Sequence, residues 1–225
     1  IVTLLWSDGE RMVPLGFRVY SAGESTKTQL ALELLSEARN RLKLKPQWVL
    51  FDSWYASKAI LKRLSDYGWA FITQLKKNRN FNNVALEDYR KTPYWNEVGF
   101  LKCGLKVLVV RHRKKYFVSN RLNLDPKELR MIYRKRQLIE NFFAYLKSHL
   151  SLERCQAGNK RTMTLVEVQK TEAQKNHITL CITAFLVLEK ERSRKKSTWL
   201  QAKQEYIFRG RIAEIPALNR LRKIA

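Results

Sequence analysis

The sequence predicts an α/β fold, in which helices connect the strands of a mixed sheet. Three observations lead to this prediction: a hairpin pattern at the start, two short apolar stretches that alternate with helical patterns, and a return to helix after residue 124. The apolar stretches, one ending at Asp52 and the other at residues 69–75, are short and continuous, as strands buried on both faces are. Helices that alternate with such strands typically cross over a single sheet.

The hairpin pattern occupies the first 21 residues. Residues 1–6 and 11–21 are two β-rich runs, joined by a turn that contains Asp8 and Gly9. Such a dipeptide between apolar runs is a hairpin signal. Pro14 predicts that the second strand is an edge strand or is bulged, because proline cannot donate a hydrogen bond to a neighbouring strand.

Two helices flank the strand that ends at Asp52. Residues 24–44 form an amphipathic pattern, with Ser25 or Thr26 as the expected N-cap. Residues 57–68 form a second helical pattern, which Gly68 is expected to end.

The second half of the chain departs from this alternation. Residues 76–124 contain a polar loop and several β-like pieces, which predict a small β insertion. Residues 125–150 return to helix, with Asp125 as the cap and Pro126 at the first helical position. A basic loop and a last long helix follow. The expected division is a first core part, a β insertion, a helical core part and a basic tail: 1–75, 76–124, 125–195 and 196–225.

The charge balance points to a polyanionic partner. The chain has 44 Lys and Arg against 20 Asp and Glu, a net charge of +24. A protein of this size with such an excess favours a nucleic acid, because many cations can then contact phosphates.

Cysteine usage and hydropathy exclude several other classes. Cys103, Cys155 and Cys181 are odd in number, far apart and not at zinc-ligand spacing from the histidines. We therefore expect reduced thiols and a cytoplasmic protein. The longest apolar run, residues 178–188, is shorter than the roughly 18 residues that a membrane span needs, so no membrane partner is expected.

Glu140 is an isolated acid in the basic stretch "YRKRQLIENFFAYLK". On a continuous helix, Tyr133, Arg136, Glu140 and Lys147 fall within one sector of roughly 60° beside the apolar face. The simple explanation is a surface ion pair between Arg136 and Glu140 at i, i+4.

Asp52 suggests more than an ion pair. It follows the strand "WVLF", and ligands of open α/β sheets gather outside the carboxyl ends of the strands. Its alternative role is to cap the next helix, although Ser57 is better placed for that. Hard divalent cations bind carboxylate oxygens, and two such ions can clamp a phosphodiester.

The spacing Y-x2-R-x3-E-x6-K, formed by Tyr133, Arg136, Glu140 and Lys147, resembles the signature of bacterial insertion-sequence transposases of the DDE class. "VLFDSWYASKAILKRL" resembles the segment that carries the second catalytic aspartate of that family, which would be Asp52. "NHITLCITAFLVLEKER" resembles the helix after the catalytic glutamate.

This resemblance implies a ribonuclease H-like core with a β insertion before the helix of the glutamate. Asp52 and Glu140 would bind Mg²⁺, or Mn²⁺ in its place, and would catalyse cleavage of double-stranded DNA at transposon ends and strand transfer into target DNA. A homodimer in a synaptic complex, associated with the bacterial nucleoid, is the implied assembly.

One departure from the family pattern affects the expected activity. The family places its first catalytic aspartate on a strand ahead of the hairpin, whereas this sequence begins at the hairpin. We therefore expect an N-terminally truncated copy that binds DNA and cleaves it poorly. Asp8 is the nearest acid, but it lies in a turn. The alternatives are a non-catalytic DNA-binding remnant and a ribonuclease H-like nuclease.

Four residues are candidate DNA contacts. Arg136 and Lys147 are expected to bind phosphates, and Tyr133 either places its hydroxyl on a phosphate or packs half in the core. Trp95 belongs to an aromatic group in the β insertion, most of which we expect to form a small core. The sharper hypothesis is that Trp95 stacks on a base displaced near the cleavage site.

Overall fold

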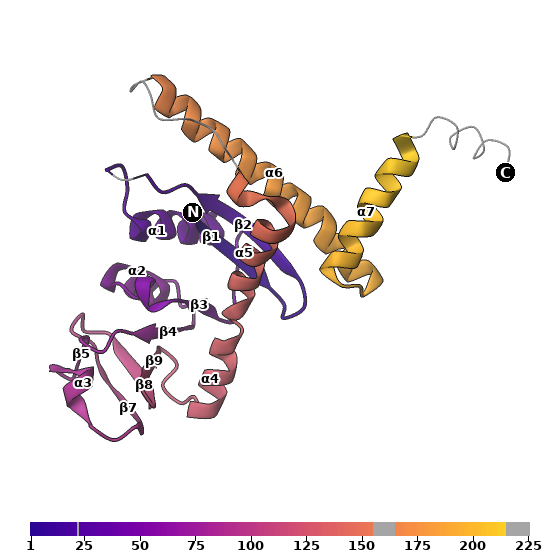
Figure 1. The fold of residues 1–225 in the computed structure, drawn as a ribbon. Helices are drawn as coiled ribbons and strands as arrows, with labels where there is room; N and C mark the ends of the chain where they lie inside the picture. Colours follow the sequence, from indigo (N-terminus) through magenta and orange to yellow (C-terminus); the bar gives the residue numbers. More distant parts are fainter. Residues whose placement is uncertain (22, 155–164, 215–225) are drawn as a thin grey trace. The chain divides into compact units, whose positions relative to one another are not determined.

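A five-stranded mixed sheet organises most of the first 140 residues. The computed structural model describes residues 1–21, 23–154 and 165–214 (Figure 1). The sheet has the strand order β3-β4-β9-β8-β7, in which β3 and β4 are parallel and the other neighbours are antiparallel. Its strands are β3 (Val49–Phe51), β4 (Phe71–Leu75), β7 (Tyr94–Phe100), β8 (Lys106–His112) and β9 (Lys115–Ser119).

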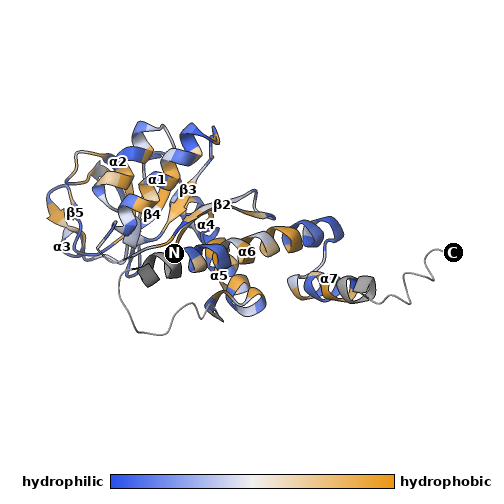
Figure 2. Cartoon of the chain, turned by 90° about the horizontal axis from the view of Figure 1, so that it is seen from above, coloured by the Kyte–Doolittle hydropathy of each residue, from blue (hydrophilic) through white to orange (hydrophobic). Residues whose placement is uncertain are grey.

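Helices cover both faces of this sheet. On one face, Phe71 and Val109 pack with residues of α1 and α2 in a large apolar core. On the other face, Ile72 and Leu108 pack with residues of α4. Neighbouring residues of one strand thus enter different cores, as the two-residue period of a strand requires. The helices are α1 (Lys27–Asn40), α2 (Lys58–Asp66) and α4 (Pro126–Arg134). In Figure 2, β3 is drawn in the hydrophobic colour, as its sequence VLF requires.

The helix N-termini are capped by the residues that the sequence indicates. Thr26 accepts from the backbone of Gln29 and forms a capping box with it at the start of α1. Ser57 caps α2, and Asp125 caps α4 with a proline in the first turn. These caps confirm the predicted starts of all three helices.

The β-rich part differs from the expected small insertion with a core of its own. Strands β7, β8 and β9 continue the sheet of β3 and β4, because β9 pairs with β4 along its length. A short hairpin and a one-turn helix precede β7: β5 (Asn80–Phe81), β6 (Val84–Ala85) and α3 (Leu86–Tyr89). The sheet class itself, a mixed α/β arrangement, is as predicted.

The predicted pairing of the first two strands is confirmed: β1 (Val2–Ser7) pairs with β2 (Met12–Arg18). These strands form a two-stranded sheet of their own, which is one difference from the predicted single sheet, and the long basic helix shows another. The single helix predicted over residues 125–150 is two helices, α4 and α5 (Gln137–Leu150). Between them, the amides of Lys135 and Arg136 donate to carbonyls three residues back, which tightens the chain and ends α4.

The described chain divides into two compact units. The first consists of Ile1–Leu4 and Leu15–Glu140, and the second of Leu5–Pro14 and the described residues from Asn141 onward. The second contains the rest of α5, η2 (Leu152–Arg154), α6 (Leu165–Lys195) and α7 (Trp199–Glu214). In it, the ring of Phe185 lies 4.7 Å from that of Phe142 and 4.6 Å from that of Trp199. Of the helices in the described parts of the chain, none is long and apolar enough to cross a membrane.

Candidate active site at the end of strand β3

Asp52 is held in place by the turn that follows β3. Its Oδ1 accepts a hydrogen bond from the backbone amide of Trp54 at 3.0 Å and another from the Ser53 hydroxyl at 3.1 Å. Asp52 thereby caps the short 3₁₀ helix η1 (Ser53–Tyr55), while Ser57 caps α2. The capping role does not use Oδ2, so one oxygen of Asp52 is available for another partner.

Arg136 joins this aspartate to Glu140. Its Nη1 lies 3.9 Å from Oδ2 of Asp52, and its Nη2 donates to Oε1 of Glu140 at 2.6 Å. The side chain of Arg136 is 20% exposed, whereas those of Asp52 and Glu140 are 51% and 47% exposed. Two carboxylates from segments 88 positions apart in the chain therefore meet at one guanidinium and remain open to solvent.

Electrostatics favour the charged guanidinium. Burial opposes the charge of Arg136, but the hydrogen bond to Glu140 and the nearby negative groups raise its pKa overall. The two carboxylates are about half exposed, so solvent weakens their attraction to the guanidinium. Arg136 is therefore a resident cation that occupies both carboxylates and competes with other cations for them.

Tyr133 anchors the end of α4 to the end of β3. Its ring is buried and packs edge-on against Phe117 at 5.3 Å, and its hydroxyl donates to the backbone carbonyl of Phe51 at 3.3 Å. Burial is the main reason why the pKa of Tyr133 is raised to about 12. Of the two roles expected for Tyr133, the structure shows the packing of its ring in the core. Its hydroxyl fixes the end of α4 to the carbonyl of Phe51, the residue that precedes Asp52.

The burial of Trp95 contradicts the hypothesis that it stacks on a displaced base. Only 8% of Trp95 is exposed, and its ring lies 5.4 Å from that of Tyr89 and 6.1 Å from that of Phe81. A base cannot stack on a ring whose faces are covered by other aromatic side chains. Trp95 is a core residue of the sheet, as most of its aromatic group was expected to be.

Lys147 and Asp8 belong to the second unit. The Nζ of Lys147 pairs with Glu153 at 2.6 Å. The oxygens of Asp8 are bound within its own turn, where Oδ1 accepts from the backbone amides of Glu10 and Arg11 and Oδ2 pairs with the Arg11 guanidinium. These bonds, above all that from the Arg11 amide, lower the pKa of Asp8 to about 2. Asp8 therefore has the turn role that the sequence indicates. Cys155 lies outside the described residues.

The acid pair has the donor chemistry of a hard-cation site. Mg²⁺ binds through one or two carboxylates, keeps several waters and takes further oxygens from substrate phosphates. Asp52 and Glu140 fit such an ion as the protein part of its ligands. Within residues 1–21, 23–154 and 165–214, no group of three or more His, Cys, Asp or Glu is arranged to hold a metal ion.

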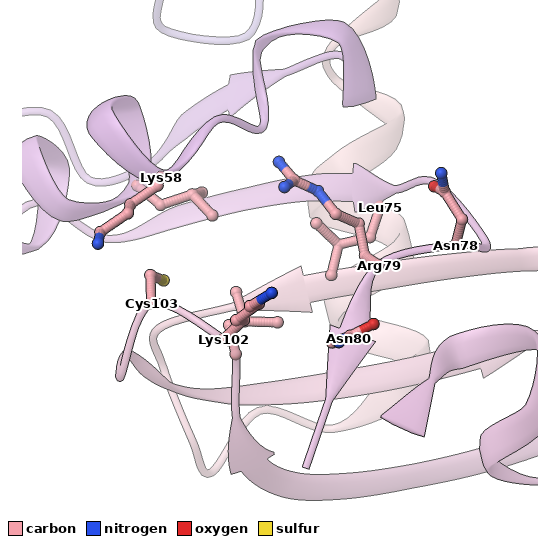
Figure 3. A pocket seen from close by; sticks show the side chains of 9 residues that line it. Lys58, Leu75, Asn78, Arg79, Asn80, Lys102 and Cys103 are labelled. Carbon is pink, nitrogen blue, oxygen red and sulfur yellow. The ribbon is translucent and has the colours of Figure 1, made fainter. Parts of the chain in front are cut away.

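A basic pocket of about 440 Å³ lies in the same unit, between α2 and the loop after β4. Figure 3 shows the cationic side chains of Lys58, Arg79 and Lys102 around it. The guanidinium of Arg79 donates to the carbonyl of Ala56, so it is fixed to the segment between η1 and α2. These side chains make the lining of the pocket positively charged.

Sequence reasoning missed an exposed aromatic residue next to Asp52. Trp54 is 63% exposed, and the ammonium groups of Lys76 and Lys27 lie 4.9 Å and 5.8 Å from its ring. The signal was its place in "FDSWY", two positions after the strand-end acid.

Comparison with known families identifies one family for this chain. The family model for the transposase DDE domain matches residues 4–166, a stretch that contains Asp52, Tyr133, Arg136, Glu140 and Lys147. No curated protein matches the chain. Members of the family generally use a divalent metal ion and act on DNA. The match covers most of the chain and confirms the resemblance of the spaced signature. The chain therefore belongs to the family of transposase DDE domains, which cut DNA and carry out transposition.

Proposed function

We propose that Asp52 and Glu140 are the catalytic acids of a DNA transposase that cleaves transposon ends and transfers them into target DNA. The observation that carries this proposal is the meeting of both carboxylates at the Arg136 guanidinium, beside the carboxyl end of β3. Family membership supplies the reaction class, and the open carboxylates supply oxygens for a divalent cation.

Each residue of the site has a separate task in this proposal. Asp52 and Glu140 would hold a divalent cation, Mg²⁺ or Mn²⁺, and Asp52 would use the oxygen that the η1 turn leaves open. Such an ion would supply charge stabilisation for the phosphodiester and would activate the attacking oxygen. Arg136 neutralises the two acids before DNA arrives and contacts a phosphate afterwards. Tyr133 fixes the end of α4 to the end of β3, next to the segment that leads to Arg136 and Glu140.

The wider assignment follows the family. We propose a ribonuclease H-like core in which residues 1–75 and 125–195 carry the acids. The β-rich residues 76–124 are inserted between these two parts of the chain and extend their sheet, and residues 196–225 are a basic tail. The partners are the double-stranded DNA of transposon ends and target, and a second copy of the chain in a synaptic complex. The proposed location is the bacterial cytoplasm, on the nucleoid.

A non-catalytic DNA-binding remnant is the second candidate, and the size of the acid group favours it. Two-metal catalysis uses several carboxylates, and the site described here contributes Asp52 and Glu140. Both candidates require DNA binding through phosphates, whereas only the first requires cleavage. A ribonuclease H-like nuclease would cleave DNA without strand transfer.

DNA binding by residues 1–225 tests what both candidates share. We expect binding to a duplex that carries the ends of the encoding element to weaken steeply with salt, and nicking of that duplex in Mg²⁺ to be slow. Lys147→Gln should weaken binding equally on all sequences and lower the salt slope by about 1, because one phosphate contact is lost. Fluorescence anisotropy at several KCl concentrations measures both quantities.

Glu153→Gln is the matched control, since it breaks the same ion pair and leaves Lys147 in place. It should keep or increase the salt slope. A loss in Lys147→Gln that is confined to one DNA sequence would instead assign Lys147 to base reading. A wild-type chain that binds no duplex at low salt would contradict both candidates.

A further inference from the structure

Trp54 is an exposed aromatic residue whose surroundings are cationic. Its ring is flanked by the ammonium groups of Lys76 at 4.9 Å and Lys27 at 5.8 Å, and Lys27 also lies 5.1 Å from the ring of Tyr20. These residues border an open groove of about 590 Å³, with polar side chains from the start of α1 on its other side. Tyr20 is also exposed, so the groove presents two aromatic side chains to solvent.

The fold fixes this group beside the acid pair. The amide of Trp54 donates to Oδ1 of Asp52, so the turn that orients the acid also orients the backbone of Trp54. Lys76 follows β4 directly, and β4 is the parallel neighbour of β3. Lys27 is the first residue of α1, which contacts η1. The groove and Asp52 are therefore built on the same end of the sheet.

Core packing does not account for an indole that is 63% exposed. What distinguishes Trp54 is its place, because its amide donates to Asp52 and two lysines flank its ring. Cation–π contacts with two lysines hold the ring in place, but they also surround it with mobile positive charge. A flat apolar ring between flexible ammonium groups matches a nucleotide, which has a flat base and a charged phosphate.

We propose that Trp54, Lys27 and Lys76 form a binding site for an unpaired nucleotide of the DNA strand next to the cleaved bond. The base stacks on the indole, and the two ammonium groups bind the flanking phosphates. The inference rests on the proposed function, because it places this nucleotide beside Asp52. A paired base keeps its faces within the duplex stack, so the site selects a base that has left the stack.

Binding to three labelled DNAs tests this site: a blunt duplex, the same duplex with a four-nucleotide single-stranded overhang, and that overhang made abasic. We expect wild-type residues 1–225 to bind the overhang more tightly than the other two. Trp54→Ala should weaken binding to the overhang about tenfold and leave the blunt and abasic DNAs within about twofold, since stacking on one base contributes that much. Trp54→Phe, which keeps a flat ring, should restore most of the loss.

Phe100→Ala is the matched control, because it removes an exposed aromatic side chain from β7, at the opposite edge of the sheet from β3. It should bind all three DNAs like the wild type. Equal losses of Trp54→Ala on all three DNAs, or no loss on the overhang, would overturn the nucleotide site while leaving the proposed function intact. Wild-type protein that binds none of the three would overturn the proposed function, and the site with it. Thermal unfolding of each variant checks that the fold is kept.

Discussion

Glu140→Gln and Asp52→Asn are each expected to lower cleavage of DNA while leaving the affinity for DNA equal or higher. Each change keeps the shape of the side chain and removes one negative charge from the acid pair. Cation-dependent nicking should fall by about 100-fold or more, because stabilisation of the phosphodiester by the cation contributes several kcal/mol. DNA affinity should stay equal or rise by up to about fivefold, because Arg136 loses a competing partner. The measurements are nicking of an element-end duplex and anisotropy with the same duplex.

Glu128→Gln is the control for the loss of charge, since Glu128 lies in the first turn of α4, eight positions before Arg136. It should not change nicking. If Glu140→Gln and Asp52→Asn nicked DNA as fast as the wild type, the two carboxylates would not be catalytic. If either variant lost DNA binding together with nicking, the carboxylate would have a structural role.

Arg136→Ala should bind Mn²⁺ more tightly and DNA more weakly than the wild type. The guanidinium lies 2.6 Å from Glu140 and 3.9 Å from Asp52, so it competes with any other cation for both carboxylates. Without DNA, the affinity of the variant for Mn²⁺ should rise about fivefold, since an exposed ion pair contributes up to about 1 kcal/mol. DNA affinity should fall and the salt slope should decrease by about 1, because one phosphate contact is lost.

Arg134→Ala provides the comparison for Arg136. It removes the same charge from an exposed position in the last turn of α4. We expect it to leave the affinity for Mn²⁺ unchanged. A wild-type affinity for Mn²⁺ in Arg136→Ala would mean that the guanidinium does not occupy the cation site, and a rise in both variants would indicate only a general effect of charge.

Local sequence signals predicted that Asp52 follows a short apolar strand, and they predicted the caps. The choice of Asp52 and Glu140 as catalytic acids came from the resemblance to the transposase family and is a proposal. Asp125 and Ser57 were predicted as caps by their residue type and place, because their hydrogen bonds reach only two or three residues along the chain.

The break between α4 and α5 was not predictable in this way. Residues 127–150 contain no glycine or proline, so the pattern continues through Arg136 without a signal to stop. The contacts that distinguish this point are distant in sequence: the hydroxyl of Tyr133 bonds to Phe51, and Arg136 reaches Asp52. Distant contacts of this kind override local propensity.

The burial of Trp95 could not be predicted from the sequence, for a different reason. In "YWNEVGF", apolar side chains occupy both faces of the strand, so the two-residue period does not show which face is covered. Gly99 shows which face of β7 is covered, but only once the folded structure is known. A Cβ at this position would lie 2.5 Å from the ring of Phe81, which shows that the face with Gly99 and Trp95 packs closely against Phe81.

Binding of Mn²⁺ to residues 1–225 tests most directly whether Asp52 and Glu140 share one cation. Electron paramagnetic resonance counts free and bound Mn²⁺, and it does not depend on DNA cleavage. We expect the wild type to have one Mn²⁺ site, whose affinity falls at least about tenfold in Asp52→Ala and in Glu140→Ala. The double variant should lose little more, because both residues bind the same ion. Two single variants that retain wild-type binding, or losses that add up as for independent sites, would contradict this expectation.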